Sequence, residues 1–142
     1  QVFRRQRRMI GVLVATHGEM AKGLFDAIDM ICGTQEKFSI VSLKRGQDAE
    51  SFGEELREKI NELNSDEGVV VLVDLLGATP MNQSALNLYK SDKVEVITGV
   101  NLPMVVTATM EREWVSDIKE LVEKIKNDGK DSVCSVRELL NI

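Results

Sequence analysis

The sequence contains few of the residue types that common binding sites require. It has one histidine, His17, and two cysteines, Cys32 and Cys134, so a single chain cannot build a zinc site from histidine and cysteine. Its six aromatic residues are too few to favour stacked bases or a flavin sandwich. Its apolar runs, such as residues 68–73, are far shorter than a membrane span requires. We expect a cytoplasmic protein without metal or cofactor, whose two cysteines are reduced and serve as small packing residues.

The charge of the chain is unevenly distributed. The net charge is −5, but residues 1–8, QVFRRQRR, hold four arginines and no acid. The net charge of −5 argues against a general nucleic-acid binder, and without residues 1–8 the chain carries 14 basic and 23 acidic residues, a net charge of −9. We expect residues 1–8 to be a basic arm that is disordered or foreign to the protein, the alternative being a patch for an acidic partner. Residues 9–142 suit a single domain that starts at Met9.

Apolar runs of strand length alternate with amphipathic stretches of helix length. Strands separated by helices imply βαβ crossovers, and therefore a doubly wound, mainly parallel α/β sheet with helices on both faces. The tail is ambiguous, because DSVCSV suits a short strand and VRELLNI suits a helical turn. The predicted strands are residues 9–16, 38–43, 68–73 and 94–98, and the predicted helices are residues 21–31, 49–64, 79–89, a segment starting at Asn101, and residues 114–126.

Chemically active residues directly follow the predicted strands. His17 follows the first strand and Asp74 the third, and in a parallel sheet such positions share the edge at which ligands bind. An imidazole attacks phosphorus as a nucleophile when one ring nitrogen is unprotonated. A carboxylate bonded to the other nitrogen would fix the tautomer and stabilise the positive ring that forms. We therefore take His17 as a candidate phosphoryl acceptor and Asp74 as its partner.

Four further residues at this edge are candidates for contacting a phosphoryl group or a partner protein. Gly18 lets the backbone approach closely at a helix start, and Thr79 offers a hydroxyl, although it also suits the N-cap of the following helix. Asn101 is likewise a good N-cap. Leu76 is either core or part of an exposed apolar patch that meets a partner. For each candidate, an ordinary role in a loop or a cap is the alternative.

Three stretches of the sequence stand out at these positions: VATHGEMAKGL, VLVDLLGATPMN and ITGVNLPM. In residues, order and spacing they resemble the signature stretches of the mannose-type enzyme IIA of the bacterial sugar phosphotransferase system. The resemblance extends from about residue 9 to the C-terminus. It implies a phosphocarrier that takes a phosphoryl group from the protein HPr onto a histidine and passes it to a IIB component. The IIB component in turn phosphorylates sugar that enters through the membrane components IIC and IID.

The resemblance also assigns roles to individual residues. The phosphorylated histidine falls on His17, its carboxylate partner on Asp74, the hydroxyl position on Thr79, and the Gly-Val-Asn loop includes Asn101. It implies a homodimer that exchanges an antiparallel C-terminal edge strand, which would be the DSVCSV segment. Two leucines, the second of them Leu76, stand where some members carry Thr-Trp, so the partner-facing surface differs. We expect a stand-alone IIA unit, and such a unit does not contact the sugar.

Three other functions are open at this stage. A related phosphocarrier that serves a dihydroxyacetone kinase also uses an early histidine, although GATPMN and the Gly-Val-Asn loop favour the sugar transporter. A receiver-like signalling module would be phosphorylated on Asp74, but it needs acids for Mg²⁺ after the first strand, where only Glu19 is near. A flavodoxin-like binding protein would need more hydroxyls and more aromatic residues than this chain supplies.

Overall fold

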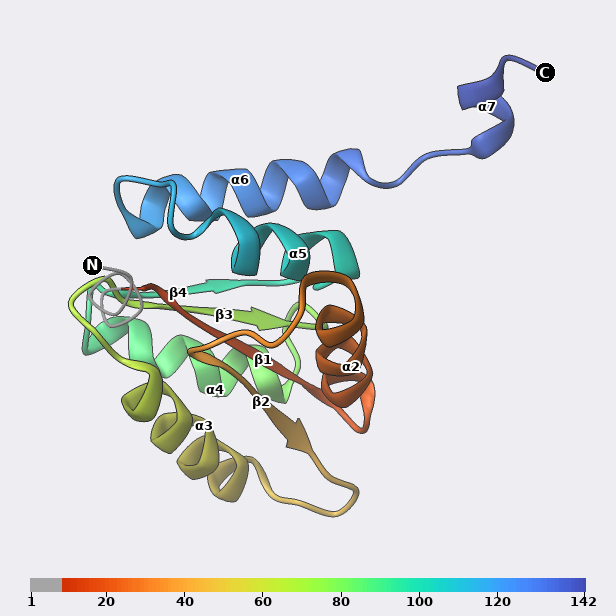
Figure 1. Ribbon diagram of the computed structural model, residues 1–142. Coiled ribbons are helices and arrows are strands. Elements are labelled where there is room, and N and C mark those ends of the chain that lie inside the picture. Colours follow the sequence, from red (N-terminus) through yellow and green to blue (C-terminus); the bar gives the residue numbers. More distant parts are fainter. Residues whose placement is uncertain (1–8) are drawn as a thin grey trace.

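The fold is a parallel α/β sheet, seen in a computed structural model that describes residues 9–142 (Figure 1). The predicted basic arm, residues 1–8, lies outside the described residues. Four strands pair in the order β2-β1-β3-β4, and every pair is parallel. This confirms the predicted doubly wound parallel sheet. The strands are β1 (Gly11–His17), β2 (Phe38–Leu43), β3 (Val69–Val73) and β4 (Val94–Ile97).

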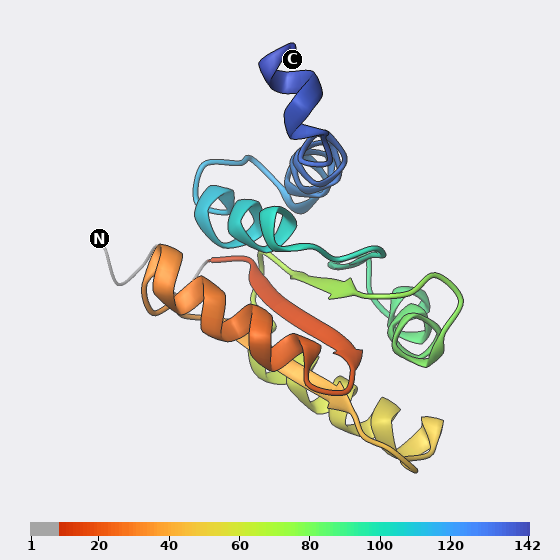
Figure 2. The same ribbon diagram turned by 90° about the vertical axis from the view of Figure 1, so that its right-hand side faces the viewer.

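Helices cover both faces of the sheet. Helices α2 and α5 lie over one face with α6 packed beside α5, while α3 and α4 lie over the other face (Figures 1 and 2). No helix within residues 9–142 is both long enough and apolar enough to cross a membrane. The helices are α2 (Met20–Cys32), α3 (Ala49–Leu63), α4 (Thr79–Ala85), which continues into the 3-10 helix η1 (Leu86–Tyr89), α5 (Leu102–Glu111), α6 (Ile118–Asp131) and α7 (Val136–Leu140).

The two faces of the sheet have separate apolar cores. Val12 and Val14 of β1 pack into the core with α2, α5 and α6, whereas the alternating Leu13 and Ala15 pack with α3. Side chains of a strand point to opposite faces in turn, so a strand covered on both sides must be apolar at every position. This is why β1 and β3 appear in the sequence as uninterrupted apolar runs.

The predicted helix over residues 114–126 begins later than its apolar stripe suggested. Trp114 lies in a turn after α5 with its side chain exposed, and α6 starts at Ile118. Asp117 caps α6 by accepting the N–H of Glu120 at 2.9 Å, and Glu120 in turn accepts the Ser116 hydroxyl at 2.7 Å. This cap sets the start of α6 at Ile118, because the first N–H groups of a helix need acceptors.

The C-terminal segment contains no strand in this single chain. Helix α6 includes Asp131, residues 133–135 are irregular, and α7 follows, so DSVCSV does not form the expected antiparallel strand. This segment extends away from the body of the protein (Figure 1). Cys134 is exposed here and is not the packing residue that was expected, whereas Cys32 does pack against the core. A strand needs a neighbouring strand, and in this single chain the tail does not reach the open edge of the sheet at β4.

Candidate functional site

The two principal site residues lie at the carboxyl edge of the sheet. β1 ends at His17, and Asp74 directly follows β3, the neighbour of β1. From β1 the chain passes to β2 on one side and afterwards to β3 on the other side. His17 and Asp74 therefore lie at the point where the strand order reverses, which is where open α/β sheets bind their ligands.

His17 and Asp74 form a hydrogen-bonded pair. Nδ1 of His17 lies 2.8 Å from Oδ2 of Asp74, and the backbone N–H of His17 donates to the same oxygen at 2.9 Å. Oδ1 of Asp74 accepts the N–H of Leu75 at 2.9 Å. The side chain of Asp74 is 10% exposed, whereas that of His17 is 45% exposed. The backbone thus fixes the carboxylate, the carboxylate fixes the ring, and the ring is accessible.

The electrostatics of the pair determine which ring nitrogen is free. Burial acts to raise the pKa of Asp74, but hydrogen bonds from the His17 N–H, the His17 ring and the Leu75 N–H together hold it below its usual range. Asp74 is therefore ionised at neutral pH, and an ionised carboxylate only accepts hydrogen bonds. Nδ1 of His17 consequently carries the proton, and Nε2 carries the free lone pair.

The turn from β1 to α2 holds His17 in place. Gly18 adopts a φ of 55°, a conformation that glycine reaches at little cost, and its N–H donates to the Leu43 carbonyl at 2.9 Å. The buried hydroxyl of Thr16 accepts the N–H of Ala21 at 2.9 Å. Gly18 therefore shapes the turn, and its own N–H is engaged within the fold.

The loop between β3 and α4 combines an apolar surface with a hydroxyl. Leu75 and Leu76 are 59% and 80% exposed, so they form an apolar patch and are not core residues. Ala78 has the extended backbone of an N-cap and its carbonyl accepts the Asn82 N–H at 2.9 Å. The N-cap prediction for Thr79 is therefore wrong: Thr79 is the first residue of α4, and its hydroxyl forms no capping hydrogen bond.

Asn101 forms the cap that its sequence context predicted. Its Oδ1 accepts the N–H of Met104 at 3.0 Å at the start of α5, and its Nδ2 donates to the Gly129 carbonyl of α6 at 3.3 Å. A Cβ on Gly129 would lie 2.5 Å from the Met104 side chain, so only glycine permits this approach of α6 to α5. Both ends of the Asn101 side chain are thus engaged in joining two helices.

Two basic residues that the sequence analysis did not single out lie beside His17. Lys44 and Arg45 follow β2, and they line a hollow of about 310 Å³ together with His17 and Gly18. Their position directly after a strand is the same signal that identified His17. It could therefore have identified them as well.

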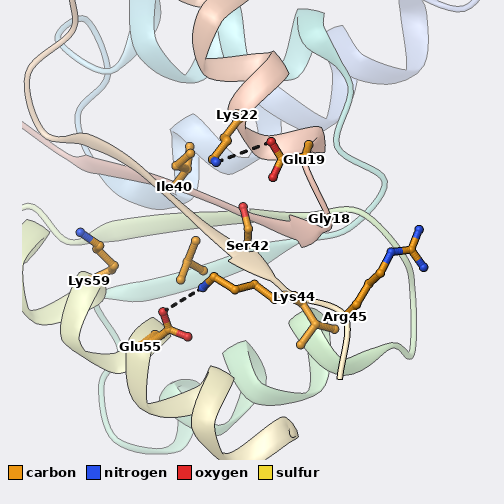
Figure 3. A pocket seen from close by; sticks show the side chains of 11 residues that line it. Gly18, Glu19, Lys22, Ile40, Ser42, Lys44, Arg45, Glu55 and Lys59 are labelled. Carbon is orange, nitrogen blue, oxygen red and sulfur yellow. Dashed lines mark ion pairs between the residues drawn. The ribbon is translucent and has the colours of Figure 1, made fainter. Parts of the chain in front are cut away.

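A larger hollow of about 580 Å³ adjoins the same turn, between α2, β2 and α3 (Figure 3). Most of its cations have acidic neighbours. Lys22 lies 3.5 Å from Glu19, and Lys44 lies 3.6 Å from Glu55. Lys22 is thus exposed and ion-paired.

Taken together, the site presents an accessible nucleophile of fixed tautomer. Its free ring nitrogen can attack an electrophile, and the adjacent carboxylate can stabilise the positive charge that then develops on the ring. Within residues 9–142, no group of three or more His, Cys, Asp or Glu side chains is arranged to hold a metal ion.

Fold and site together define a parallel α/β domain built around a histidine–carboxylate pair. The family model for the fructose IIA component of the phosphotransferase system (PTS), EIIA-man, matches residues 11–126. The chain therefore belongs to the mannose, fructose and sorbose type of PTS IIA components, which confirms the resemblance seen in the sequence.

Curated relatives agree with this assignment. The PTS mannose-specific EIIAB component of Escherichia coli K12 is 30% identical over 128 residues, which cover 90% of this chain and 40% of that protein. The PTS fructose-specific EIIA component of Bacillus subtilis is 27% identical over 129 residues, covering 89% of this chain and 88% of that protein. This chain thus spans less than half of the length of the first relative.

Solved structures have the same fold. A PTS IIA protein associated with the fucose utilization operon of Streptococcus pneumoniae aligns with a TM-score of 0.80 and 27% identity, covering 93% of this chain and 96% of that one. The EIIA component from Streptococcus agalactiae aligns with a TM-score of 0.84 and 23% identity, covering 92% and 99%. Both alignments support the parallel α/β architecture.

Proposed function

We propose that this chain is a phosphocarrier, which accepts a phosphoryl group from phosphorylated HPr on Nε2 of His17 and passes it to a IIB component during sugar uptake. The observation that carries this proposal is the 2.8 Å contact between Nδ1 of His17 and Asp74. It holds an accessible imidazole in the tautomer that leaves Nε2 free to attack. Membership of the PTS IIA family supports the same reaction.

The transfer uses only the groups of the two proteins. The lone pair on Nε2 of His17 attacks the phosphorus that HPr carries on a histidine nitrogen. The new N–P bond forms as the bond to HPr breaks, and the departing ring of HPr keeps the electron pair of the broken bond. Nδ1 of His17 keeps its proton and donates a hydrogen bond to Asp74, whose negative charge offsets the positive ring. The second transfer, to IIB, is the same reaction in the opposite direction.

The site geometry favours His17 over Asp74 as the phosphorylated residue. The two carboxylate oxygens of Asp74 already accept three hydrogen bonds, and its side chain is largely covered. Attack by Asp74 would require those bonds to break. The ring of His17 is accessible and would keep its contact with Asp74 throughout the reaction.

The exposed patch of Leu75 and Leu76 supports an encounter with partner proteins. It lies on the loop that follows Asp74, so a protein that reaches His17 also meets this patch. An apolar surface suits two successive partners, because its contacts are non-directional. We infer that HPr and IIB dock here in turn, through interfaces small enough to dissociate quickly.

Reconstitution of phosphoryl transfer tests the proposal. Labelled phosphoenolpyruvate, enzyme I and HPr should together label the chain at one site, and His17→Ala should abolish the label. The label should be lost in acid and retained in base, as expected for phosphohistidine and not for an acyl phosphate. Label that persists in the His17→Ala variant would disprove the mechanism.

We also propose that the chain forms a homodimer through its C-terminal segment. After α6, the segment exposes several apolar side chains, and β4 is an edge strand of the sheet. If residues 131–136 paired with β4 of a second copy, the pairing would cover the apolar segment of one copy and the open sheet edge of the other. The mass in solution, measured by sedimentation equilibrium, should be that of a dimer, and a monomer at micromolar concentration would exclude it. The exposed apolar residues are Val133, Val136, Leu139, Leu140 and Ile142.

A further inference from the structure

We propose that Arg45, with Lys44 beside it, binds the phosphoryl group while His17 carries it. The inference rests on the proposed function and adds a cation to its site. A phosphoryl group on histidine carries close to two negative charges and lies next to the ionised Asp74, so it needs a nearby positive charge. The sequence stretches that resemble the family do not include residues 44 and 45.

The geometry places both cations next to His17. Arg45 and Lys44 line the same hollow as His17, whose volume of about 310 Å³ is ample for a phosphoryl group. The Gly18 N–H donates to the Leu43 carbonyl at 2.9 Å, which joins the turn after His17 to the end of β2. The residue after Leu43 is Lys44, so this bond keeps the two loops together.

The backbone that carries Arg45 is itself braced. The N–H of Lys44 donates to Oε1 of Gln47 at 3.0 Å, and the N–H of Gln47 donates to the Lys44 carbonyl at 3.1 Å. These two bonds close a tight turn around Arg45. A cation on a fixed turn loses less conformational freedom when it binds a ligand than one on a loose loop.

The local pairing of charges makes Arg45 the principal candidate. Lys44 lies 3.6 Å from Glu55, and Lys22 lies 3.5 Å from Glu19, whereas Arg45 forms no ion pair within residues 9–142. In Figure 3 Lys44 extends toward Glu55 and Arg45 extends in a different direction. A guanidinium also presents parallel donors that match the oxygens of a phosphoryl group, as an ammonium does not.

The backbone of the site leaves room for such a side-chain donor. The N–H of Gly18 is already engaged with Leu43, and that of Ala21 with the Thr16 hydroxyl. One amide of the turn before α2 and one in the first turn of α2 are therefore unavailable to an anion. Arg45 supplies donors that these amides do not.

The test uses protein phosphorylated chemically on His17 with phosphoramidate, which needs no partner protein. In that reaction the N–P bond of phosphoramidate breaks, ammonia leaves, and the bond to Nε2 forms. Phosphorus NMR then follows the titration of the phosphoryl group in wild type, Arg45→Gln and Arg57→Gln. Arg57 is the matched control, because it is an exposed arginine of α3 that lines neither hollow.

We expect Arg45→Gln to raise the midpoint of that titration by about half a pH unit, as loss of one exposed charge pair would. The equilibrium of phosphoryl transfer from HPr should shift about two- to fivefold toward HPr. Arg57→Gln should change neither quantity, Lys44→Gln should give a smaller shift, and Arg45→Lys should recover part of the effect.

Equal behaviour of Arg45→Gln and Arg57→Gln would overturn the inference. That result differs from a failure of the proposed function. If wild type accepted no label from HPr, the phosphocarrier proposal would fail even though the chemical titration could still be measured. If wild type accepted label and Arg45→Gln titrated like wild type, only the role of Arg45 would be lost.

Discussion

The two ends of the sheet each hold a hydrogen-bonded charged group, and the two groups differ in access to solvent. At the carboxyl end, His17 pairs with Asp74 and is 45% exposed. At the amino end, Arg112 follows α5 and is 3% exposed. Arg112 donates to the carbonyls of Ile10 and Lys37, both at 3.0 Å, and to that of Glu36. It therefore joins the end of α5 to the starts of β1 and β2.

The difference shows how the same kind of network serves opposite purposes. Burial lowers the pKa of Arg112 to about 10, so the group is still charged at neutral pH. Its acceptors include no carboxylate: three are backbone carbonyls and the fourth, at 3.4 Å, is the amide oxygen of Gln35. Such a group stabilises the fold but cannot meet a partner. At the other end, the carboxylate is covered and the imidazole is not, so only that end can exchange a group with another protein.

The largest expected effect separates stability from transfer at the amino end. Arg112→Met should lower the free energy of unfolding by about 3–5 kcal/mol, because it removes three charged hydrogen bonds to backbone carbonyls and leaves those of Ile10 and Glu36 without the guanidinium donor. Urea denaturation monitored by circular dichroism measures this loss. At a temperature at which the variant is folded, its rate of phosphoryl transfer should equal that of wild type. Arg57→Met, an exposed control, should change stability by less than about 0.5 kcal/mol.

A different outcome would remove the distinction between the two ends. If folded Arg112→Met transferred phosphoryl groups as slowly as a site variant, the amino end would be coupled to the chemistry through β1. An unchanged stability would instead show that water satisfies the carbonyls of Ile10, Glu36 and Lys37 as well as the guanidinium does.

The second prediction makes the complementary change at the carboxyl end. Asp74→Asn should slow phosphoryl transfer from HPr by roughly 10²-fold, because the amide cannot offset the positive ring and does not enforce the same tautomer. Quenched-flow labelling measures the rate. The free energy of unfolding should change by less than about 1 kcal/mol, since an amide oxygen can still accept from the backbone. Transfer at the wild-type rate would make Asp74 merely a residue that caps a turn.

The sequence was sufficient to predict the elements and residues that local patterns specify. Apolar runs identified β1 and β3 because both strands are buried on both faces, and in a parallel sheet the residues that follow them, His17 and Asp74, share one edge. Asn101 was predicted as a cap because its side chain satisfies the first turn of its own helix. In each of these cases a local pattern, an apolar run or a capping side chain, is enough for the prediction.

The remaining features depend on contacts that no local pattern encodes. Burial of Arg112 depends on carbonyls up to 102 residues away in the chain. The sequence around Arg112 therefore does not distinguish it from a surface arginine. Thr79 followed by proline fits an N-cap, but the extended backbone at Ala78 moved the cap by one residue. Lys44 and Arg45 follow a predicted strand as His17 does, but only the pairing of β2 with β1 shows that they lie next to His17.

The smallest expected effect concerns the dependence of stability on pH, which distinguishes the two ends once more. The pKa of Asp74 is lower in the folded chain than its unfolded value near 3.9, so the folded state gains stability from its ionisation. This contribution is fully present above about pH 4 and is lost as the pH falls through the folded-state pKa. The gap in unfolding free energy between wild type and Asp74→Asn should therefore narrow below about pH 4.

Arg112, with a pKa of about 10, stays protonated throughout this range, so the gap in unfolding free energy between wild type and Arg112→Met should not narrow in the same way. Urea denaturation from pH 3 to pH 7 measures both differences in unfolding free energy. If they narrowed equally, general acid unfolding and not the His17–Asp74 pair would account for the loss of stability at low pH.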